Sequence, residues 1–332
     1  MDRLESLRQW LESVLGHGDF TLAPASNDAS FRRYFRASFA DGRPSLIAMD
    51  APPGHEDCRP YVHVAKLFGA AGVHVPALHA CDLDRGFLLL SDLGDITYLA
   101  ALGEGNADRL YGDALDALIR IQLASRADAL HDYSRELLSR ELALFPEWYV
   151  GRQLGAELSG SRRQVLDEGF ARLLENNLAQ ARVFVHRDYH SRNLMLSEPN
   201  PGILDFQDAV YGPVTYDLVS LLRDAYVCWP EERVIDWCIR YWERARKSGL
   251  PLAPDFADFY RDFEWMGAQR QFKVLGIFAR LCFRDGKDGY LRDQPLVMRY
   301  LRATCGRYRE LAPLARLLDE LEPAEKKTGY TF

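Results

Sequence analysis

The stretch from Val183 to Asp208 reads VFVHRDYHSRNLMLSEPNPGILDFQD and decides the fold. Its short β-branched run at 183–185 predicts a buried strand, and the polar loop H-R-D-Y-H-S-R-N follows at 186–193. Two further short apolar runs lead to D-F-Q-D, whose first aspartate lies twelve residues after the loop asparagine. The order strand, H-R-D-x-x-x-x-N, strand pair, D-F-x is typical of ATP-dependent phosphoryl transfer.

Phosphoryl transfer needs oxygen-bearing side chains in three roles, and this stretch supplies them. Asp188 is the candidate base, which accepts the proton of the attacking hydroxyl and directs its oxygen toward phosphorus. Asn193 and Asp205 are candidate ligands of Mg²⁺, a hard ion that prefers oxygen. His190 lies where a donor would face the transferring phosphoryl group; the alternative is a histidine that only packs the loop. We expect His186 to support the loop from beneath.

Two other interpretations of this loop stay open. In the first, its aspartate and asparagine only cap turns and helices. In the second, His186, Asp188 and His190 share one face of an extended segment and bind zinc. The zinc interpretation leaves Asn193 and Asp205 without a role, and the sequence offers no further His/Cys cluster to complete such a site. The ordered set of motifs therefore favours phosphoryl transfer.

Outward from this stretch, the chain divides into a strand-rich part and a helical part. Strand signals occur at 31–39, 44–49, 76–81 and 87–90, with a helical pattern at 56–71. Beyond Tyr98, helical periodicity recurs at 108–123, 133–153, 161–180, 213–227, 230–247, 254–283 and past 290. The sequence thus predicts an α+β, bilobal fold. We expect a β-rich nucleotide-binding lobe at 1–92 and a mostly helical catalytic and substrate-binding lobe at 93–332.

Composition narrows the class of partner. The 332 residues are 48% hydrophobic and 27% charged, with a formal net charge of −7, which disfavours a nucleic-acid partner. Apolar runs fall short of the roughly 18 residues of a membrane span, and the first residues show no signal-peptide core. Six cysteines lie far apart without a C-x-x-C pair. We therefore expect a cytoplasmic protein that acts on a small molecule, with no membrane or obligate protein partner.

The segment after the D-F-Q-D motif carries a family resemblance. Only about eight residues separate Asp205 from the next predicted helix, near Val214, and no A-P-E element follows. With the run DFQDAVYGPVTYDL at 205–218, the motifs resemble the protein-kinase-like fold and specifically its aminoglycoside phosphotransferase branch. The resemblance implies that Asp217 braces the catalytic loop. The short connection favours a small-molecule substrate over a peptide.

A narrower resemblance extends over most of the chain. The stretches at 27–36, 49–53, 91–95 and 269–280 are similar to the bacterial anomeric amino-sugar kinases of cell-wall recycling. That similarity implies transfer of phosphate from ATP to the C1 hydroxyl of N-acetylmuramate and N-acetylglucosamine. Other interpretations are a kinase of an aminoglycoside, a choline-like amine or another metabolite, and a catalytically inactive nucleotide-binding module.

Candidate nucleotide contacts lie in the strand-rich part. They are a glycine-free turn between two strands and a connector that offers backbone groups to adenine: Ser26, Asn27, Asp28, Ala29, Ser30, Ser91, Asp92 and Leu93. The lysine that such kinases carry in V-A-I-K is missing, since Met49 or Asp50 stands in its place. Arginines of the preceding strand are the candidate substitutes, and Arg32 is assigned to the nucleotide. The missing lysine keeps the inactive module open as an alternative.

Candidate sugar contacts lie mainly on the helical pattern at 254–283. The set Gln269-Arg270-Gln271-Phe272-Lys273, with Trp265, places polar and aromatic groups at helical spacing. A lactyl carboxylate would need Lys or Arg, and sugar hydroxyls would need Gln or Asp. We assign Trp265, Gln269, Lys273, Arg223 and Asp208 to the substrate. The alternatives are a helix that packs its tryptophan inward, and an Asp208 that caps the helix expected at 213.

Overall fold

The computed structural model describes residues 2–25 and 31–322, and its contacts divide the chain into two compact units. The first unit runs to Ala124 and includes Arg192–Ala209; the second comprises Ser125–Ser191 and the chain from Val210 onward. The predicted boundary between lobes at residue 92 stays a prediction, because these units are defined by packing alone.

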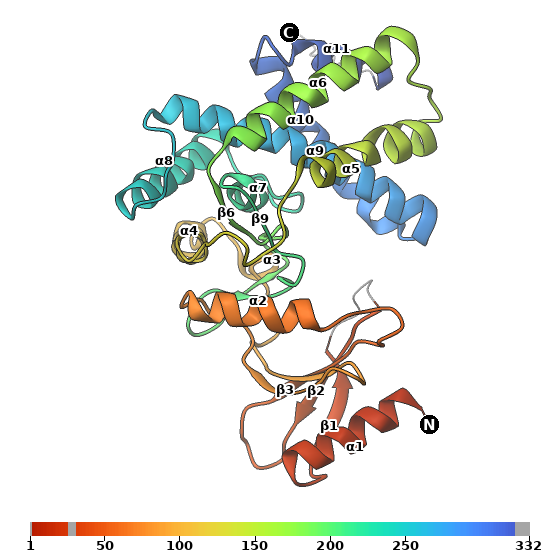
Figure 1. Cartoon of the computed structure of the whole chain (residues 1–332), viewed down its shortest axis with the longest axis vertical. Helices are drawn as coiled ribbons and strands as arrows, with labels where there is room; N and C mark the ends of the chain where they lie inside the picture. The colour runs from red at the N-terminus through yellow and green to blue at the C-terminus, as the bar shows by residue number, and fades with distance from the viewer. Residues whose placement is uncertain (1, 26–30, 323–332) are drawn as a thin grey trace, which may run out of the picture. The chain divides into compact units, whose positions relative to one another are not determined.

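The first unit is built on an antiparallel five-stranded sheet of order β1-β2-β3-β5-β4 (Figure 1). Its strands are β1 (Thr21–Pro24), β2 (Arg33–Ser38), β3 (Leu46–Asp50), β4 (Leu78–Asp82) and β5 (Phe87–Ser91). Helices α1 (Arg3–Leu15), α2 (Arg59–Ala70), α3 (Tyr98–Ala101) and α4 (Ala107–Leu123) and the short hairpin β7–β8 (Leu194–Met195, Gly202–Ile203) complete the unit. The predicted strands and helices of this region are confirmed.

The two faces of this sheet have different neighbours, because successive strand residues point to opposite faces. On one face, Ala37, Ala48 and Leu89 pack with Leu7 and Trp10 of α1 in a buried cluster, and α1 lies beside these strands in Figure 1. On the other face, Tyr34 and Arg36 of β2 pair with Met49 and Ile47 of β3. Three of the latter side chains, Tyr34, Arg36 and Ile47, line a cavity.

One glycine fixes the turn before β5. Gly86 has φ +72°, a left-handed conformation that favours glycine, and a Cβ there would meet the Ala51 carbonyl oxygen at 1.9 Å. Its own carbonyl accepts the Ala51 N–H at 2.8 Å. The turn therefore ties the end of β3 to the start of β5.

The second unit is a set of helices around α9 (Phe256–Asp285), most of which is buried (Figure 1). Around it lie α5 (Arg135–Leu144), η1 (Phe145–Gln153), α6 (Gly160–Ala179), α7 (Tyr216–Leu222), α8 (Glu231–Lys247), η2 (Asp288–Asp293), α10 (Gln294–Arg307) and α11 (Ala312–Leu321). Gly276 lets α9 approach the chain at Leu144, whose carbonyl carbon would lie 2.4 Å from an added Cβ. This close approach positions α9 against α5 and η1.

Two sequence predictions in this unit are wrong in detail. The helix predicted at 213–227 is the shorter α7, and the strand before it, β9 (Val210–Pro213), which pairs with β6 (Arg182–Val185), was not predicted. The helix predicted at 133–153 divides into α5 and the π-helix η1, which has Pro146 in its first turn. Proline has no backbone N–H, so regular α-helical bonding cannot continue through it.

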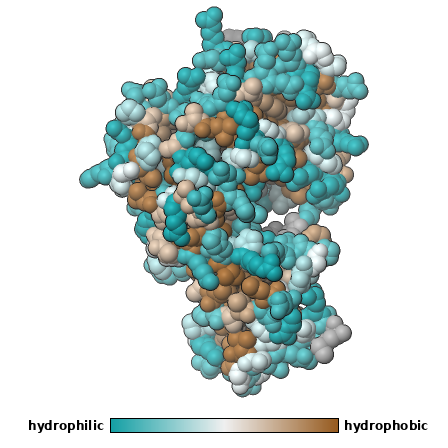
Figure 2. Space-filling view, viewed as in Figure 1, coloured by the Kyte–Doolittle hydropathy of each residue, from teal (hydrophilic) through white to brown (hydrophobic). Residues whose placement is uncertain are grey.

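No helix among the described residues is long and apolar enough to cross a membrane. On the face drawn in Figure 2, hydrophilic side chains predominate and apolar ones are interspersed among them. All six cysteines are free.

Candidate active site

The catalytic loop in the second unit is held by one buried carboxylate. Asp217, at the start of α7, accepts the backbone N–H of His186 at 2.6 Å and that of Arg187 at 2.9 Å. Arg187 has φ +78°, a conformation that costs energy in a residue with a side chain. The two hydrogen bonds stabilise this strained backbone directly before Asp188. The brace that the family resemblance implies for Asp217 is thus a direct contact.

Asp217 titrates unusually because it is only 1% exposed. Burial raises the pKa of Asp217 to about 6, against the opposing effects of the His186 charge and the two N–H groups.

A buried ionic network lies under the same loop. Glu141 of α5 pairs with Arg187 at 2.6 Å and with Lys273 of α9 at 3.0 Å, and it accepts the hydroxyl of Tyr133. Lys273 also donates to the Tyr216 hydroxyl at 2.9 Å. Burial acts to raise the pKa of Glu141, but the two cations outweigh it and lower the pKa. The network therefore joins α5, α7 and α9 to the loop as ionised partners.

Asp188 is half-buried and surrounded by positive charge. Burial acts to raise its pKa, but the charges of Lys273, His190, Arg270 and Arg187 outweigh burial and lower the pKa below its ordinary value. The Asp188 carboxylate is therefore ionised at neutral pH, as a group that accepts a proton or orients a hydroxyl must be.

His190 lies beside Asp188 at the turn of the loop. Its backbone N–H donates to the Asp188 carbonyl at 3.0 Å, and its ring meets the ring of Tyr226 edge-on at 5.6 Å. Asp224 fixes both sides of this contact, because it accepts the N–H groups of Ser191 and Tyr226, each at 3.0 Å. Donation to a phosphoryl group and packing of the loop both suit this position, so the role of His190 stays a prediction.

The two predicted magnesium ligands are adjacent in the first unit. Asn193 and Asp205 flank the β7–β8 hairpin, where the Leu204 N–H donates to the Asn193 carbonyl at 2.9 Å. The Asn193 Nδ2 lies 3.5 Å from the Asp205 Oδ2, and Gln207 donates to the other carboxylate oxygen at 2.8 Å. An amide and a carboxylate side by side suit Mg²⁺ when the amide presents its oxygen, whereas here its nitrogen faces Asp205. Their role as ligands remains a prediction.

The zinc interpretation finds no support in the geometry. Among residues 2–25 and 31–322, no group of three or more His, Cys, Asp or Glu side chains is placed to hold a metal ion. His186 and Asp188 instead meet through the Asp188 N–H, which donates to the His186 Nδ1 at 3.3 Å.

A cavity of about 480 Å³ lies wholly within the first unit. Its lining includes the connector predicted to contact adenine (Ser91, Asp92, Leu93) and both predicted metal ligands (Asn193, Asp205). The remaining wall includes Tyr34, Arg36, Ile47 and Leu90 of the sheet and Ala25, which directly follows β1. Volumes of this order are usual for small-molecule sites. The predicted turn residues Ser26, Asn27, Asp28, Ala29 and Ser30 lie outside the described residues.

Asp92 fixes an arginine in this cavity. Its carboxylate accepts the Arg36 Nε at 2.5 Å and the Ser45 hydroxyl at 2.7 Å, and Arg36 also donates to the Gly94 carbonyl at 3.1 Å. The pKa of Asp92 is lowered, because the hydrogen bonds of Arg36 and Ser45 outweigh the opposing effect of burial. The Asp92 side chain therefore shapes the cavity wall, and contact of the connector backbone with adenine stays a prediction.

The position of the missing strand lysine is occupied by groups with other partners. Met49 is buried, and the Asp50 carboxylate pairs with Arg3 and Arg33. The arginine assigned to the nucleotide, Arg32, pairs with Glu56 at 2.9 Å. Burial acts to lower the pKa of Arg32, but the surrounding negative groups, which include Asp208, raise it.

The predicted sugar residues fall into two groups. Lys273 belongs to the network under the catalytic loop, and Asp208 faces Arg32 and does not cap α7, whose N-cap is Thr215. The other three have partners within the helical packing. Arg223 forms a two-pronged pair with Glu231 at 2.8 and 3.0 Å, Gln269 donates to the Leu138 carbonyl at 3.1 Å, and the Trp265 ring packs on Tyr308. Their contact with substrate stays a prediction.

Sequence reasoning missed Glu141 and Asp224, although both hold the loop. The signal for Glu141 is a charged residue within an apolar helical stripe, between Leu138 and Leu142. Asp224 follows the end of α7 and gives no comparable signal.

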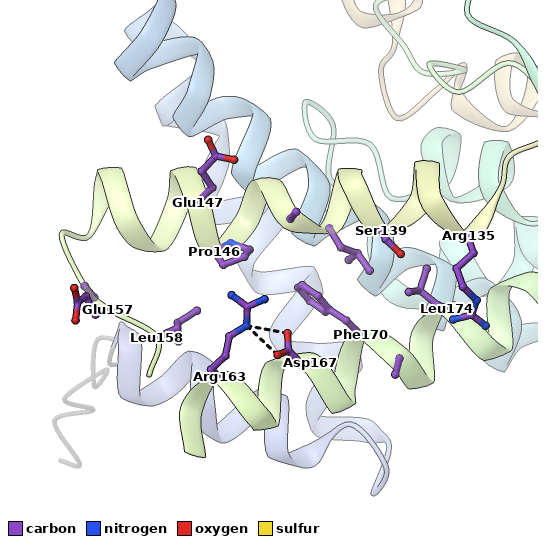
Figure 3. Close-up of a pocket in the computed structure, with 14 residues that line it drawn as sticks. Arg135, Ser139, Pro146, Glu147, Glu157, Leu158, Arg163, Asp167, Phe170 and Leu174 are labelled. Atoms are coloured by element: carbon purple, nitrogen blue, oxygen red, sulfur yellow. Dashed lines mark hydrogen bonds and ion pairs between the residues drawn. The ribbon is translucent and has the colours of Figure 1, made fainter. Parts of the chain in front are cut away.

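A larger cavity of about 650 Å³ lies elsewhere in the second unit, between α5–η1 and α6. Figure 3 shows Arg163 and Asp167 paired on α6, below the segment that carries Pro146 and Glu147. None of the predicted site residues lines this cavity, so volume alone does not identify the active site.

Known proteins are similar to this chain in sequence and in fold over nearly its whole length. The chain is 51% identical to an N-acetylmuramate/N-acetylglucosamine kinase of Neisseria meningitidis serogroup B, with 100% of each chain covered, and 54% identical to one of Pseudomonas aeruginosa, with 96% and 97% covered. Among solved structures, a choline/ethanolamine kinase family protein from Mesorhizobium loti superposes with a TM-score of 0.63 at 14% identity, covering 96% of this chain and 100% of that one. An ADP-bound aminoglycoside phosphotransferase gives 0.55 at 12%, covering 89% and 97%.

These similarities confirm the α+β, kinase-like fold and the predicted family resemblance. The model of one family, described as the phosphotransferase enzyme family, matches residues 21–255, a range that holds the cavity, the catalytic loop and Asp217. With the braced H-R-D loop, the adjacent asparagine and aspartate, and this match together, the chain belongs to the phosphotransferase enzyme family.

Proposed function

We propose that this protein transfers the γ-phosphoryl group of ATP to the C1 hydroxyl of N-acetylmuramate and N-acetylglucosamine. The relatives that carry the names of these two sugars are about half identical to this chain and cover nearly all of it. ATP is the phosphoryl donor that the family implies.

The observation that carries the proposal is the state of Asp188. An ionised, half-buried carboxylate on a loop held by Asp217 is suited to receive a proton from a sugar hydroxyl. A module that only binds nucleotide would have no need of this group. Positioning contributes more than proton removal in phosphoryl transfer, and the braced loop supplies the positioning.

Nucleotide and metal contacts follow from the first unit. The backbone of Ser91, Asp92 and Leu93 would receive adenine, and Arg32 would replace the strand lysine near the phosphates. Asn193 and Asp205 would hold Mg²⁺ through oxygen. When bound, the ion neutralises charge on the β- and γ-phosphates. Glu56 keeps the Arg32 guanidinium in place, as a helix carboxylate does for the lysine of other kinases.

Location in the cytoplasm is part of the same proposal. ATP is an intracellular donor, and six free cysteines are usual for a reducing compartment.

Turnover by Asp188→Asn tests the proposal. We expect the wild-type protein with Mg·ATP to phosphorylate both sugars, with phosphorus NMR placing the product at C1. The variant should bind Mg·ATP with unchanged affinity and lose about 10²–10⁴-fold in kcat. A matched control is Asp236→Asn, an exposed aspartate of α8, which should leave both quantities unchanged.

Three outcomes would contradict the proposal. A variant with near-native kcat would remove Asp188 from its role. A product phosphorylated away from C1 would remove the assigned acceptor. Turnover of aminoglycosides or choline-like amines in place of the two sugars would favour the alternative substrates.

A further inference from the structure

Arg270 is a buried cation that forms no salt bridge or hydrogen bond with a described residue, although the Asp188 carboxylate lies near it. It lies on α9, one turn before Lys273, and only 6% of it is exposed. No described residue within 2–25 and 31–322 forms an ion pair or hydrogen bond with its guanidinium. Its neighbours differ: Lys273 and Arg187 pair with Glu141, and Arg223 pairs with Glu231. A buried charge without a partner is costly, so an anionic ligand is the natural complement.

The face of α9 that carries Arg270 is directed at the catalytic loop. Residues three or four positions apart on a helix share one side, and a residue eight positions along lies about 80° around the axis. Lys273 on this side reaches Tyr216 at the start of α7, and Phe278 contacts the ring of Tyr226, which in turn contacts the ring of His190. Arg270 precedes both contacts along the helix, and around the helix axis its direction lies between those of Lys273 and Phe278. It is also near enough to Asp188 to help lower the pKa of that carboxylate.

The chemistry of the two proposed sugars suggests which anion this is. They differ at C3, where N-acetylmuramate carries a lactyl ether with a carboxylate and N-acetylglucosamine carries a hydroxyl. The cations nearest Asp188 other than Arg270 are the loop histidine and two side chains that already form ion pairs with Glu141. A guanidinium binds a carboxylate through two parallel N–H donors, which a lysine cannot do.

We propose that Arg270 binds the lactyl carboxylate of N-acetylmuramate and thereby sets the preference between the two sugars. This inference rests on the proposed function. It assigns Arg270 the role in recognising the anion that sequence reasoning had left to lysines and arginines of this segment in general.

Removing the charge on either side of the contact tests this. In Arg270→Gln, kcat/KM for N-acetylmuramate should fall by about 30-fold or more, mainly through KM, and for N-acetylglucosamine by less than about 3-fold. Arg270→Lys should recover part of the loss, because it keeps the charge without the fork. Arg284 is an exposed arginine on the same helix, and Arg284→Gln should leave kcat/KM unchanged for both sugars.

The substrate side needs no variant. The primary amide of the lactyl group has nearly the same shape as the carboxylate but no charge. Wild-type kcat/KM for the amide should fall by about the same factor, and Arg270→Gln should add no further loss. The inference is overturned by an equal loss on both sugars in Arg270→Gln, or by an amide that the wild-type protein uses as well as the acid. If the wild-type protein phosphorylates neither sugar, the proposed function fails instead.

Discussion

Replacing Asp217 with asparagine tests how the catalytic loop is held. The Asp217 carboxylate accepts two backbone N–H groups, from His186 at 2.6 Å and Arg187 at 2.9 Å. Asparagine has the same size but one acceptor oxygen, so one N–H group would face an amide donor. Hydrogen bonds to charged groups contribute about 1.5–3 kcal/mol each. We expect Asp217→Asn to lower the free energy of unfolding by about this amount at a pH where no other effect compensates.

The pKa of Asp217 supplies an offset that depends on pH. Burial raises the pKa to about 6 from 3.8, and each unit is worth about 1.4 kcal/mol, so ionised Asp217 costs about 3 kcal/mol. The folded state binds this proton more tightly than the unfolded chain does. The contribution to stability is therefore full below about pH 4 and is lost as the pH rises through about 6. Asparagine does not ionise and avoids this loss.

These two effects give a specific expectation. Near pH 7 the two effects offset each other, and the free energy of unfolding of Asp217→Asn should lie within about 1.5 kcal/mol of the wild-type value. Near pH 4.5 the offset is smaller, and the cost of the lost acceptor should emerge. At pH 7 kcat should fall by about 10²-fold, because a displacement of about 1 Å at Asp188 has that effect.

Urea unfolding at both pH values and steady-state kinetics at pH 7 check the expectation. Asp236→Asn on the exposed part of α8 is the matched control and should be neutral in both assays. An equal stability cost at the two pH values would refute the account of burial and ionisation. A near-native kcat would refute the claim that the two hydrogen bonds position Asp188.

Three further predictions concern the nucleotide and the packing. Asp205→Ala should abolish metal-dependent ATP binding, and calorimetry with unchanged Mg·ATP affinity would contradict it. Arg32→Gln should raise KM for ATP by about 10-fold, the effect of losing one charged contact, and leave KM for the sugar unchanged. An unchanged KM for ATP would show that Arg32 does not replace the strand lysine. Gly276→Ala should lower the free energy of unfolding by about 1–2 kcal/mol, because its Cβ would collide with the Leu144 backbone, which outweighs the helical gain. Gly112→Ala in α4, where a Cβ meets nothing within 4 Å, is the control and should be neutral or stabilising in thermal or urea unfolding.

Local patterns made much of the fold predictable. Alternation locates β2 and three-to-four periodicity locates α4, because one buried face imposes each period, whereas short apolar runs mark the more fully buried strands β3 and β5. Strand β9 escaped prediction because its identity depends on pairing with β6, nearly thirty residues earlier in the chain. The π-helix η1 escaped because periodicity alone does not distinguish α from π turns.

The same distinction separates the predictable part of the site from the rest. Asp188, Asn193 and Asp205 lie close together in sequence, so their motif is visible without a structure. Glu141 and Asp224 meet the loop from 46 and 33 residues away. The sequence also cannot show that Arg270 lacks a salt bridge, because the pairing of a charge depends on packing; the structure shows that no described residue forms one with it.

The pair between Arg187 and Glu141 has a consequence for control. In kinases switched by covalent modification, the arginine before the catalytic aspartate waits for a phosphorylated residue to arrive and order the neighbouring segment. Here an internal carboxylate occupies that arginine from the moment the chain folds. Engagement of this arginine therefore needs no phosphorylated residue from a neighbouring segment.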